Sequence, residues 1–167
     1  MNISKKLESY LNEHLKVRKQ TNNIPREYDY MADEAFAGAC ACKNSSINEY
    51  IDKNKEEETF QTKLFKYIDT KNMKDSDVYN KVNIDRRLFS KIRSNKTYHP
   101  SKETIILFGI ALELKEEEIE DLLKSASYSL PKNTIYDLII RFCFKERIYN
   151  INQVNELLYS YDCKTLN

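Results

Sequence analysis

Glycine, proline and tryptophan are scarce in this chain: its 167 residues include two glycines, three prolines and no tryptophan. Because glycine and proline interrupt regular secondary structure, so few of them favour a chain built of helices. Two glycines are also too few to build a glycine-rich loop around a phosphate group. We therefore predict an all-α protein without a phosphate-binding loop of that kind.

Long apolar runs are absent as well. No run approaches the roughly 20 residues that a membrane-spanning helix needs, and the N-terminus lacks the apolar core of a signal peptide. Charged residues make up 32% of the chain. We expect a soluble, cytoplasmic protein without a membrane partner, whose four cysteines are free thiols.

Histidine is nearly absent, which limits metal binding and catalysis. Cys40 and Cys42 invite a zinc interpretation, but a zinc site needs about four ligands, usually two to four residues apart. Only His14, His99 and two distant cysteines remain to complete one. We expect His14 at the surface and His99 in a loop or on a phosphate. No Cys–His or Ser–His pair has a supporting context, so we predict no metal, no cofactor and no enzymatic activity.

Three segments organise the chain. We predict an N-terminal helical extension with a linker (residues 1–58), a five-helix domain (59–130) and a C-terminal helical hairpin (131–167). In the hairpin, apolar residues are expected to share one broad face of each helix: Ile135, Leu138, Ile139, Phe142 and Cys143 in the first, and Ile151, Val154, Leu157 and Leu158 in the second.

The N-terminal extension carries a narrow apolar stripe on a charged helix, formed at i, i+4 spacing by Ile3, Leu7, Leu11 and Leu15. Such a stripe has to pack on something. It packs either on the rest of the same chain or on the same helix of a second copy, and the sequence leaves both alternatives open.

A short helix, a reversal and a second helix follow one another in the middle of the chain. Asp75 or Ser76 is suited to cap the first helix. Asn83 falls at the reversal, and asparagine tolerates the left-handed backbone that ends a helix. Asp85 then provides an N-cap for a helix over residues 86–94.

The helix over residues 86–94 is expected to have an apolar side and a polar side. Phe89 and Ile92 point inward, and five residues remain on the other side: Arg86, Arg87, Ser90, Lys91 and Ser94. Asn95 is predicted to end this helix in the left-handed conformation. After Pro100 and Ser101, a nearly all-apolar helix follows and must be central.

Basic residues concentrate in the same region. Residues 81–102 contain seven basic residues and one acid, a balance of +6 that leaves −5 on the rest of a chain whose net charge is +1. The basic residues are Lys81, Arg86, Arg87, Lys91, Arg93, Lys96 and Lys102. A basic surface on an acidic body indicates a phosphate-contacting patch, and a solvated helix face is the plainer alternative.

The order and spacing of these elements resemble the phage-repressor-type, or xenobiotic-response-element-like, helix-turn-helix family. The matching positions are Val78, Tyr79, Asn83, Ile84, Asp85, Phe89, Ile92, Asn95, Pro100 and Ser101. Residues 60–162 also resemble a Firmicutes module often labelled DNA-binding or sigma-factor-like. The resemblance implies a five-helix repressor-like helix-turn-helix domain flanked by the N-terminal extension and the C-terminal hairpin.

Four positions depart from the family pattern. Tyr79 stands where alanine is usual, and Asn83 replaces the usual turn glycine. Arg93 takes a position where many members carry an acid, and Leu88 one where DNA-reading relatives often carry a small polar residue. An apolar Leu88 on this face favours a protein contact over pure DNA readout.

The resemblance implies a sequence-specific DNA-binding regulator of transcription, of the kind carried by phages and mobile elements, with helix 86–94 in the major groove. Arg86, Arg87 and Lys91 would contact guanine edges or phosphates, with Ser90 and Ser94 as smaller polar readers. Four residues would hold the flanking backbone: Lys96, Thr97, His99 and Lys102. Double-stranded DNA is the expected partner, and tight binding needs a homodimer.

A second hypothesis keeps the fold and changes the partner. The basic helix, Leu88 and Tyr79 would then contact an acidic or nucleic-acid-mimicking protein, and the chain would be an adaptor or inhibitor without enzymatic activity. The near-neutral net charge and the long appended segments favour this alternative. Binding to random duplex DNA at low salt separates the two hypotheses.

Overall fold

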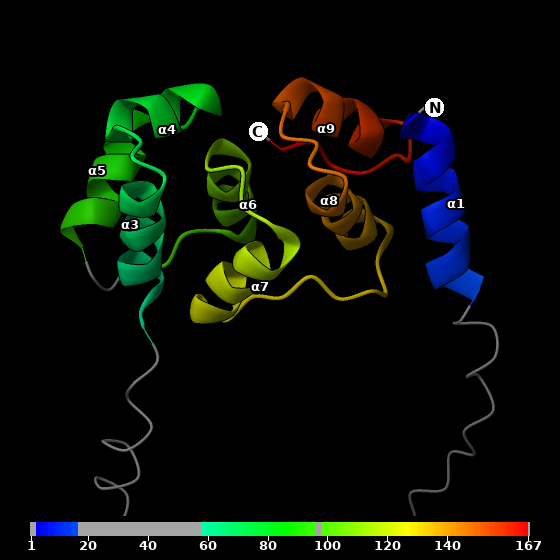
Figure 1. The fold of residues 1–167 in the computed structure, drawn as a ribbon, viewed down its shortest axis with the longest axis horizontal. Helices are drawn as coiled ribbons and strands as arrows, with labels where there is room; N and C mark the ends of the chain where they lie inside the picture. Colours follow the sequence, from blue (N-terminus) through cyan, green and yellow to red (C-terminus); the bar gives the residue numbers. More distant parts are fainter. Residues whose placement is uncertain (1–2, 17–57, 96–97, 167) are drawn as a thin grey trace, which may run out of the picture.

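The computed structural model describes residues 3–16, 58–95 and 98–166, which form eight helices and no strand (Figure 1). The helices are α1 (Ile3–Lys16), α3 (Phe60–Thr70), α4 (Asp75–Lys81), α5 (Arg86–Ser94), α6 (Lys102–Ala111), α7 (Glu116–Ser125), α8 (Ile135–Lys145) and α9 (Ile151–Tyr159). The predicted all-α class is confirmed for these residues. None of these helices has the length and apolar character needed to cross a lipid bilayer.

Side-chain caps start several of these helices. Thr59 caps α3 by accepting a hydrogen bond from the Thr62 N–H at 3.3 Å. Ser101 does the same for α6. The prediction for α4 is wrong by one residue, because Lys74 occupies the N-cap without a side-chain bond and Asp75 is the first helical residue.

Six helices end in the same way, with a residue that is not glycine in the left-handed region: Asn72, Asn83, Glu113, Ser127, Arg147 and Asp162. After each of them, the next N–H bonds to the carbonyl five residues back, which satisfies an otherwise free helix end. These six helices thus end without glycine. Helix α5 is the exception: Asn95 is extended at φ −112°, so the prediction of a left-handed Asn95 is wrong.

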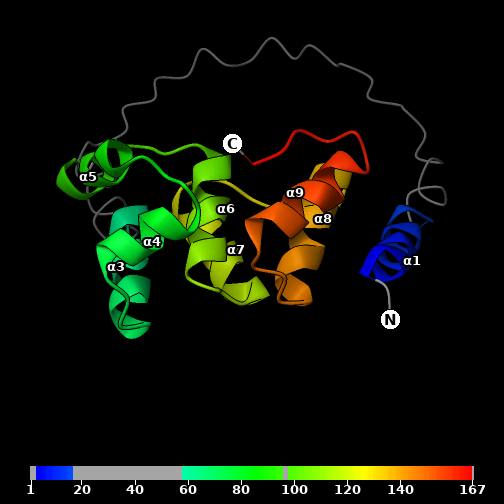
Figure 2. The same ribbon diagram turned by 90° about the horizontal axis from the view of Figure 1, so that it is seen from above.

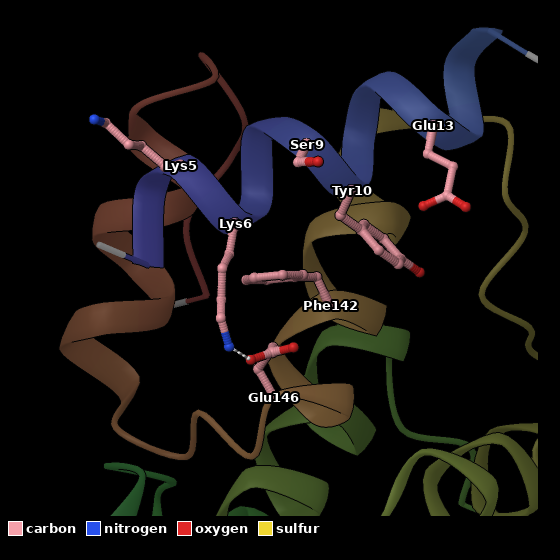
Figure 3. A pocket seen from close by; sticks show the side chains of 7 residues that line it. All are labelled: Lys5, Lys6, Ser9, Tyr10, Glu13, Phe142 and Glu146. Atoms are coloured by element: carbon pink, nitrogen blue, oxygen red, sulfur yellow. Dashed lines mark hydrogen bonds and ion pairs between the residues drawn. The ribbon is translucent and has the colours of Figure 1, made fainter. Parts of the chain in front are cut away.

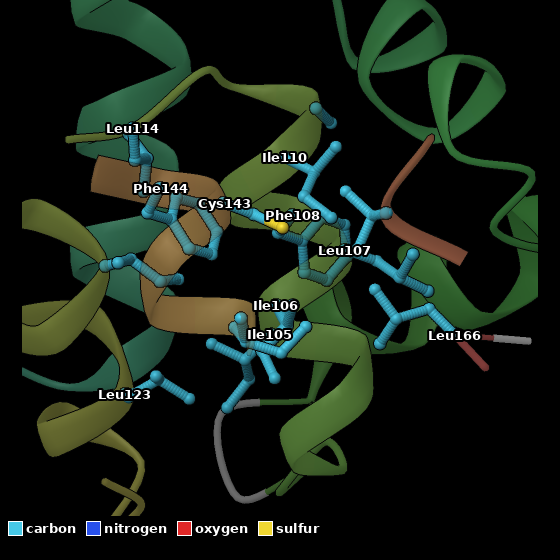
Figure 4. Packing of buried hydrophobic residues seen from close by; sticks show 14 of the residues in the cluster. Ile105, Ile106, Leu107, Phe108, Ile110, Leu114, Leu123, Cys143, Phe144 and Leu166 are labelled. Carbon is cyan, nitrogen blue, oxygen red and sulfur yellow. The ribbon is translucent and has the colours of Figure 1, made fainter. Parts of the chain in front are cut away.

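Helix α6 lies at the centre of the fold. Every residue from Ile105 to Ala111 is buried, which confirms the expected central position (Figure 4). A Cβ atom on Gly109 would lie 2.5 Å from Ile119 Cδ1 and 2.9 Å from Phe144 Cζ. The missing side chain therefore lets α7 and α8 pack closely on α6.

Helix α1 packs within the same chain, which answers the question that its apolar stripe leaves open. Leu7 and Leu11 are buried in the same core as α3–α9. The Tyr10 ring lies 5.4 Å from the Phe142 ring of α8. Lys6 Nζ is 2.6 Å from a carboxylate oxygen of Glu146, the residue that follows α8 (Figure 3). An open cleft of about 430 Å³ remains beside this contact, lined by Lys5, Lys6, Ser9, Tyr10, Glu13, Phe142 and Glu146.

Helices α8 and α9 pack against each other and join the same core. One position of the predicted apolar face is wrong, because Ile135 is 40% exposed. It is the first residue of α8 and comes before Asp137, the residue that contacts Lys102 of α6. Ile140 and Phe144, which were not assigned to that face, are buried. Helix α8 therefore buries more of its circumference than a single-faced hairpin helix would.

Candidate nucleic-acid interface

Helix α5 has one buried side and one exposed side, as its sequence predicts. At about 100° per residue, the five positions predicted for its polar side cover an arc of about 140°. These positions are Arg86, Arg87, Ser90, Lys91 and Ser94, and all five are exposed. We call this set the basic face. Phe89 and Ile92 point to the opposite side and are buried.

The N-terminal end of α5 is fixed by the turn from α4. Asn83 adopts φ 54°, and the Ile84 N–H then donates to the Tyr79 carbonyl at 2.9 Å. Asp85 Oδ1 accepts from the Arg87 N–H at 2.7 Å. The predicted left-handed Asn83 and the predicted Asp85 cap are both confirmed, so the first turn of the basic face has a defined direction.

Aromatic packing seats the buried side of α5. The Phe89 ring lies 5.6 Å from the Tyr79 ring, 5.8 Å from Phe108 and 6.1 Å from Phe65, the last two edge-on. Tyr79 is half-buried there, and its ring packs on α5. Leu88 is also half-buried against the core and exposes less apolar surface than its position suggests.

The C-terminal end of α5 is held by Arg93. Its guanidinium pairs with Asp75 of α4 and lies 4.8 Å from the centre of the Phe65 ring of α3. Its backbone carbonyl accepts from Gln61 Nε2 at 2.6 Å. The charge of Arg93 is thus paired with a carboxylate of the same chain. Asp75 and Arg93 are far apart in sequence, and no local spacing indicates the pair.

Three of the seven basic residues in this region are neutralised by the chain's own carboxylates. Lys81 pairs with Glu113 at 2.5 Å, Arg93 with Asp75, and Lys102 with Asp137 at 2.5 Å. Lys96 lies outside the described residues. Arg86, Arg87 and Lys91 have no carboxylate partner among the residues that the structure describes. Counting described residues alone, the basic face therefore carries three uncompensated charges, fewer than the local +6 suggests.

Tyr98, which the sequence analysis did not single out, borders the basic face. Lys91 Nζ lies 4.4 Å from the centre of the Tyr98 ring. The Tyr98 N–H donates to the Asn95 carbonyl at 3.1 Å, which keeps the loop after α5 close to the helix end. A cation over a ring face is held without losing its charge, so Lys91 stays available at the edge of the face.

Two residues that were predicted to contact the DNA backbone, His99 and Lys102, instead contact other parts of the protein. His99 Nε2 donates to the Ala126 carbonyl at 2.7 Å, and its ring lies 5.1 Å from the Tyr128 ring. Lys102 Nζ bonds to Asp137, which is 4% exposed. These side chains join the start of α6 to α7 and α8. Lys96 and Thr97 lie outside the described residues, so the interface proposed below rests on α5.

The described residues contain no group of three or more histidine, cysteine or acidic side chains that could hold a metal ion. Cys143 is buried, and burial raises the pKa of its thiol to about 12. Cys163 is half-buried, and burial is the main cause of its raised pKa. Both are free thiols; Cys40 and Cys42, the pair behind the zinc interpretation, lie outside the described residues.

The basic face lies at one end of the molecule. Figures 1 and 2 both place α3, α4 and α5 at one end of the long axis of the described residues and α1 at the other. Within the described part of the chain, the face is thus remote from the N-terminal helix. Comparison of the chain with protein-family models, with curated proteins and with solved structures finds no match.

Proposed function

We propose that the protein is a sequence-specific regulator that binds double-stranded DNA with α5 in the major groove. In this proposal α4, the turn at Asn83 and α5 form the helix-turn-helix unit, and α5 is the recognition helix. The observation that carries the proposal is the basic face: Arg86, Arg87 and Lys91 are exposed on one arc, and no described carboxylate pairs with them.

The dimensions of α5 suit this role. An α-helix with its side chains is about 10–12 Å across, which fits a major groove about 12 Å wide, and nine residues at about 1.5 Å each make α5 about 13 Å long. Arg86 and Arg87 belong to the first turn, the part of a recognition helix that contacts base edges. Ser90 follows one turn later on the same arc. Ser94 follows another turn along the same arc, and Lys91 lies farthest around it, where phosphates border the groove.

The two arginines and the lysine are expected to contribute differently. An arginine that bonds both acceptors of a guanine discriminates against other bases by about 1–3 kcal/mol. A lysine on a phosphate adds affinity without sequence preference and steepens the salt dependence by about 0.9 in log K against log salt. Specificity would therefore rest on Arg86 and Arg87, and Lys91 would add a general electrostatic term.

Fluorescence anisotropy with labelled duplexes tests the proposal. We expect binding to a random duplex at micromolar or lower concentration at low salt, weakening as salt rises, and tighter binding to a sequence selected from a random pool. Replacing Arg86, Arg87 and Lys91 together by alanine should abolish both. Lys5→Ala and Lys132→Ala remove exposed charges outside the basic face and should change neither. Failure of the native protein to bind any duplex at low salt contradicts the proposal.

Single substitutions then separate base contacts from phosphate contacts. Arg87→Ala should weaken binding to the selected sequence by about tenfold or more and binding to random duplex much less. Equal losses on both duplexes would assign Arg87 to a phosphate. A regulator that reads a longer site is expected to bind as a dimer, and light scattering of the free and DNA-bound protein measures this directly.

The protein-binding alternative draws on the near-neutral net charge of +1. Its apolar component is weaker than the sequence suggests, since Leu88 and Tyr79 are both half-buried against the core. An adaptor that uses the basic face would leave random duplex unbound at low salt and would still need Arg86, Arg87 and Lys91 for its acidic partner. The anisotropy experiment therefore decides between the two functions.

A further inference from the structure

The two ends of α5 are attached to the fold in different ways. At its N-terminus the helix continues from α4 through the turn at Asn83 and the Asp85 cap, so the chain itself fixes its position. At its C-terminus Asn95 is extended, and the left-handed closure that ends six other described helices is missing. A helix held only at its start and by its buried side can tilt, so the far end needs a separate attachment.

Arg93 provides that attachment through two neighbouring helices. The guanidinium pairs with Asp75 at the start of α4 and covers the Phe65 ring of α3. The backbone carbonyl of Arg93 accepts from Gln61 Nε2, which also belongs to α3. The last turn of α5 is thereby joined to α3 and α4.

We propose that Arg93 is a positioning residue, acting with Asp75 to set the tilt of α5 and so the alignment of the basic face with base edges. The inference rests on the proposed DNA-binding function and names the device that gives it sequence specificity. Bonds from an arginine to guanine depend on direction, and a small tilt separates both donors from their acceptors. Phosphate contacts tolerate such a tilt because they depend mainly on distance.

A stabilising role for the pair is the plainer alternative, and the exposure of the groups limits it. The Arg93 side chain is 56% exposed and the Asp75 side chain 33% exposed. Ion pairs between such groups contribute little to stability, because water and salt screen them. Phe89 and Ile92 already seat α5 in the core. Loss of the pair should therefore leave the fold intact and change the direction of the exposed side chains.

The substitution Asp75→Asn gives a result that charge alone cannot produce. It removes a negative charge near the basic face, so a purely electrostatic effect would strengthen binding to every duplex. If the pair positions α5, binding to the selected sequence should weaken by about tenfold, which lies within the discrimination of one bidentate arginine contact, while binding to random duplex stays equal or strengthens.

Asp77→Asn is the matched control. Asp77 is exposed on the same helix and loses the same charge, but it contacts Ser76 and not Arg93. We expect this variant to bind both duplexes at least as tightly as the native protein. A loss of discrimination in Asp77→Asn equal to that in Asp75→Asn would overturn the inference, since it would trace the effect to the charge of α4.

A double-substitution cycle with Arg93→Met completes the test. Residues that act through one contact lose it only once, so Asp75→Asn should cause no further loss of discrimination in the Arg93→Met background. Additive losses would overturn the inference, as would an Asp75→Asn protein that keeps its discrimination. Circular dichroism and thermal unfolding of each variant check that the fold persists. If the native protein binds no duplex, the proposed function fails and this inference with it; if it binds and these variants discriminate normally, the inference alone fails.

Discussion

Helices α5 and α6 are neighbours in sequence and nearly equal in length, with nine and ten residues, but they meet water differently. Helix α5 buries the apolar Phe89 and Ile92 and exposes its charged residues. Helix α6 buries every residue from Ile105 to Ala111. Consecutive helices thus divide two tasks, because α6 supplies the apolar surface on which α5 can display its cations.

This division makes the two helices experimentally separable. A substitution in α6 acts on the free energy of unfolding and leaves the charge of the basic face unchanged. A substitution on the exposed arc of α5 acts on the charge and removes almost no buried contact. If the division is correct, stability and DNA affinity should respond independently to changes in the two helices.

The largest effect is expected from Phe108→Ala in α6. Phe108 is fully buried and its ring packs edge-on to Phe89 of α5. Removing a buried phenylalanine side chain costs about 3–5 kcal/mol, since apolar contacts are lost and a cavity is left. Urea unfolding followed by circular dichroism measures the change. Tyr159→Ala, at a side chain that is 77% exposed, should change stability by less than about 0.5 kcal/mol.

Lys102→Met, at the first residue of α6, tests whether this basic residue contributes to stability or to DNA binding. The substitution leaves the Asp137 carboxylate buried with Thr134 Oγ1 as its remaining side-chain partner at 2.7 Å. Removing one partner of a buried pair is strongly destabilising, and partial exposure of Lys102 reduces the cost to about 2–4 kcal/mol.

Adding Asp137→Asn to Lys102→Met should recover part of this stability, because an amide is less costly to bury than an unpaired carboxylate. Duplex binding by the folded Lys102→Met protein should remain close to native. A normal stability with strongly reduced duplex binding would show that Lys102 contacts DNA.

The local elements of this fold were predictable from sequence, because each depends on a few adjacent residues. The Thr59 and Asp85 caps, the left-handed Asn83 and the buried α6 follow from side-chain chemistry at fixed spacing. Asn95 had the same local signal as Asn83 and adopts an extended backbone instead. Local preference at such a position is weak, and the contacts around the helix end decide the outcome.

The composition of the basic face was predictable, and its net charge was not. Periodicity placed Arg86, Arg87 and Lys91 on the exposed arc, and it could not show that Arg93 and Lys102 would be neutralised. Their partners lie on other helices, 18 and 35 residues away in the chain. A charge count along the sequence overestimates a patch whenever tertiary contacts supply counter-charges.

Alkaline pH should lower the free energy of unfolding through the buried Cys143 thiol. Burial raises the pKa of the Cys143 thiol in α8 to about 12 from its usual 9.0, so the unfolded chain loses this proton first. The stability that the neutral thiol contributes is complete below pH 9.0 and is lost as the pH rises toward 12. Between pH 8 and pH 10 we expect a loss of about 1–1.5 kcal/mol from this group.

Comparison of the native protein with Cys143→Ala isolates the contribution of the thiol. Tyrosines with raised pKa values add to the alkaline loss in both proteins, so only the difference between the two pH profiles reports on Cys143. The alanine variant should start less stable and lose less on going to pH 10. Parallel profiles would show that Cys143 does not remain protonated in the folded protein.

The smallest expected effect on stability is that of Arg87→Ala, on the exposed side of the comparison. The bond that Asp85 makes to residue 87 uses the backbone N–H, which alanine keeps. Alanine also favours helix, so the free energy of unfolding should change by less than about 0.5 kcal/mol. Urea unfolding and duplex anisotropy on one sample give both quantities. A stability loss as large as that of Phe108→Ala would place Arg87 in the packing of α5, and a face that carries structure could not be free to bind DNA.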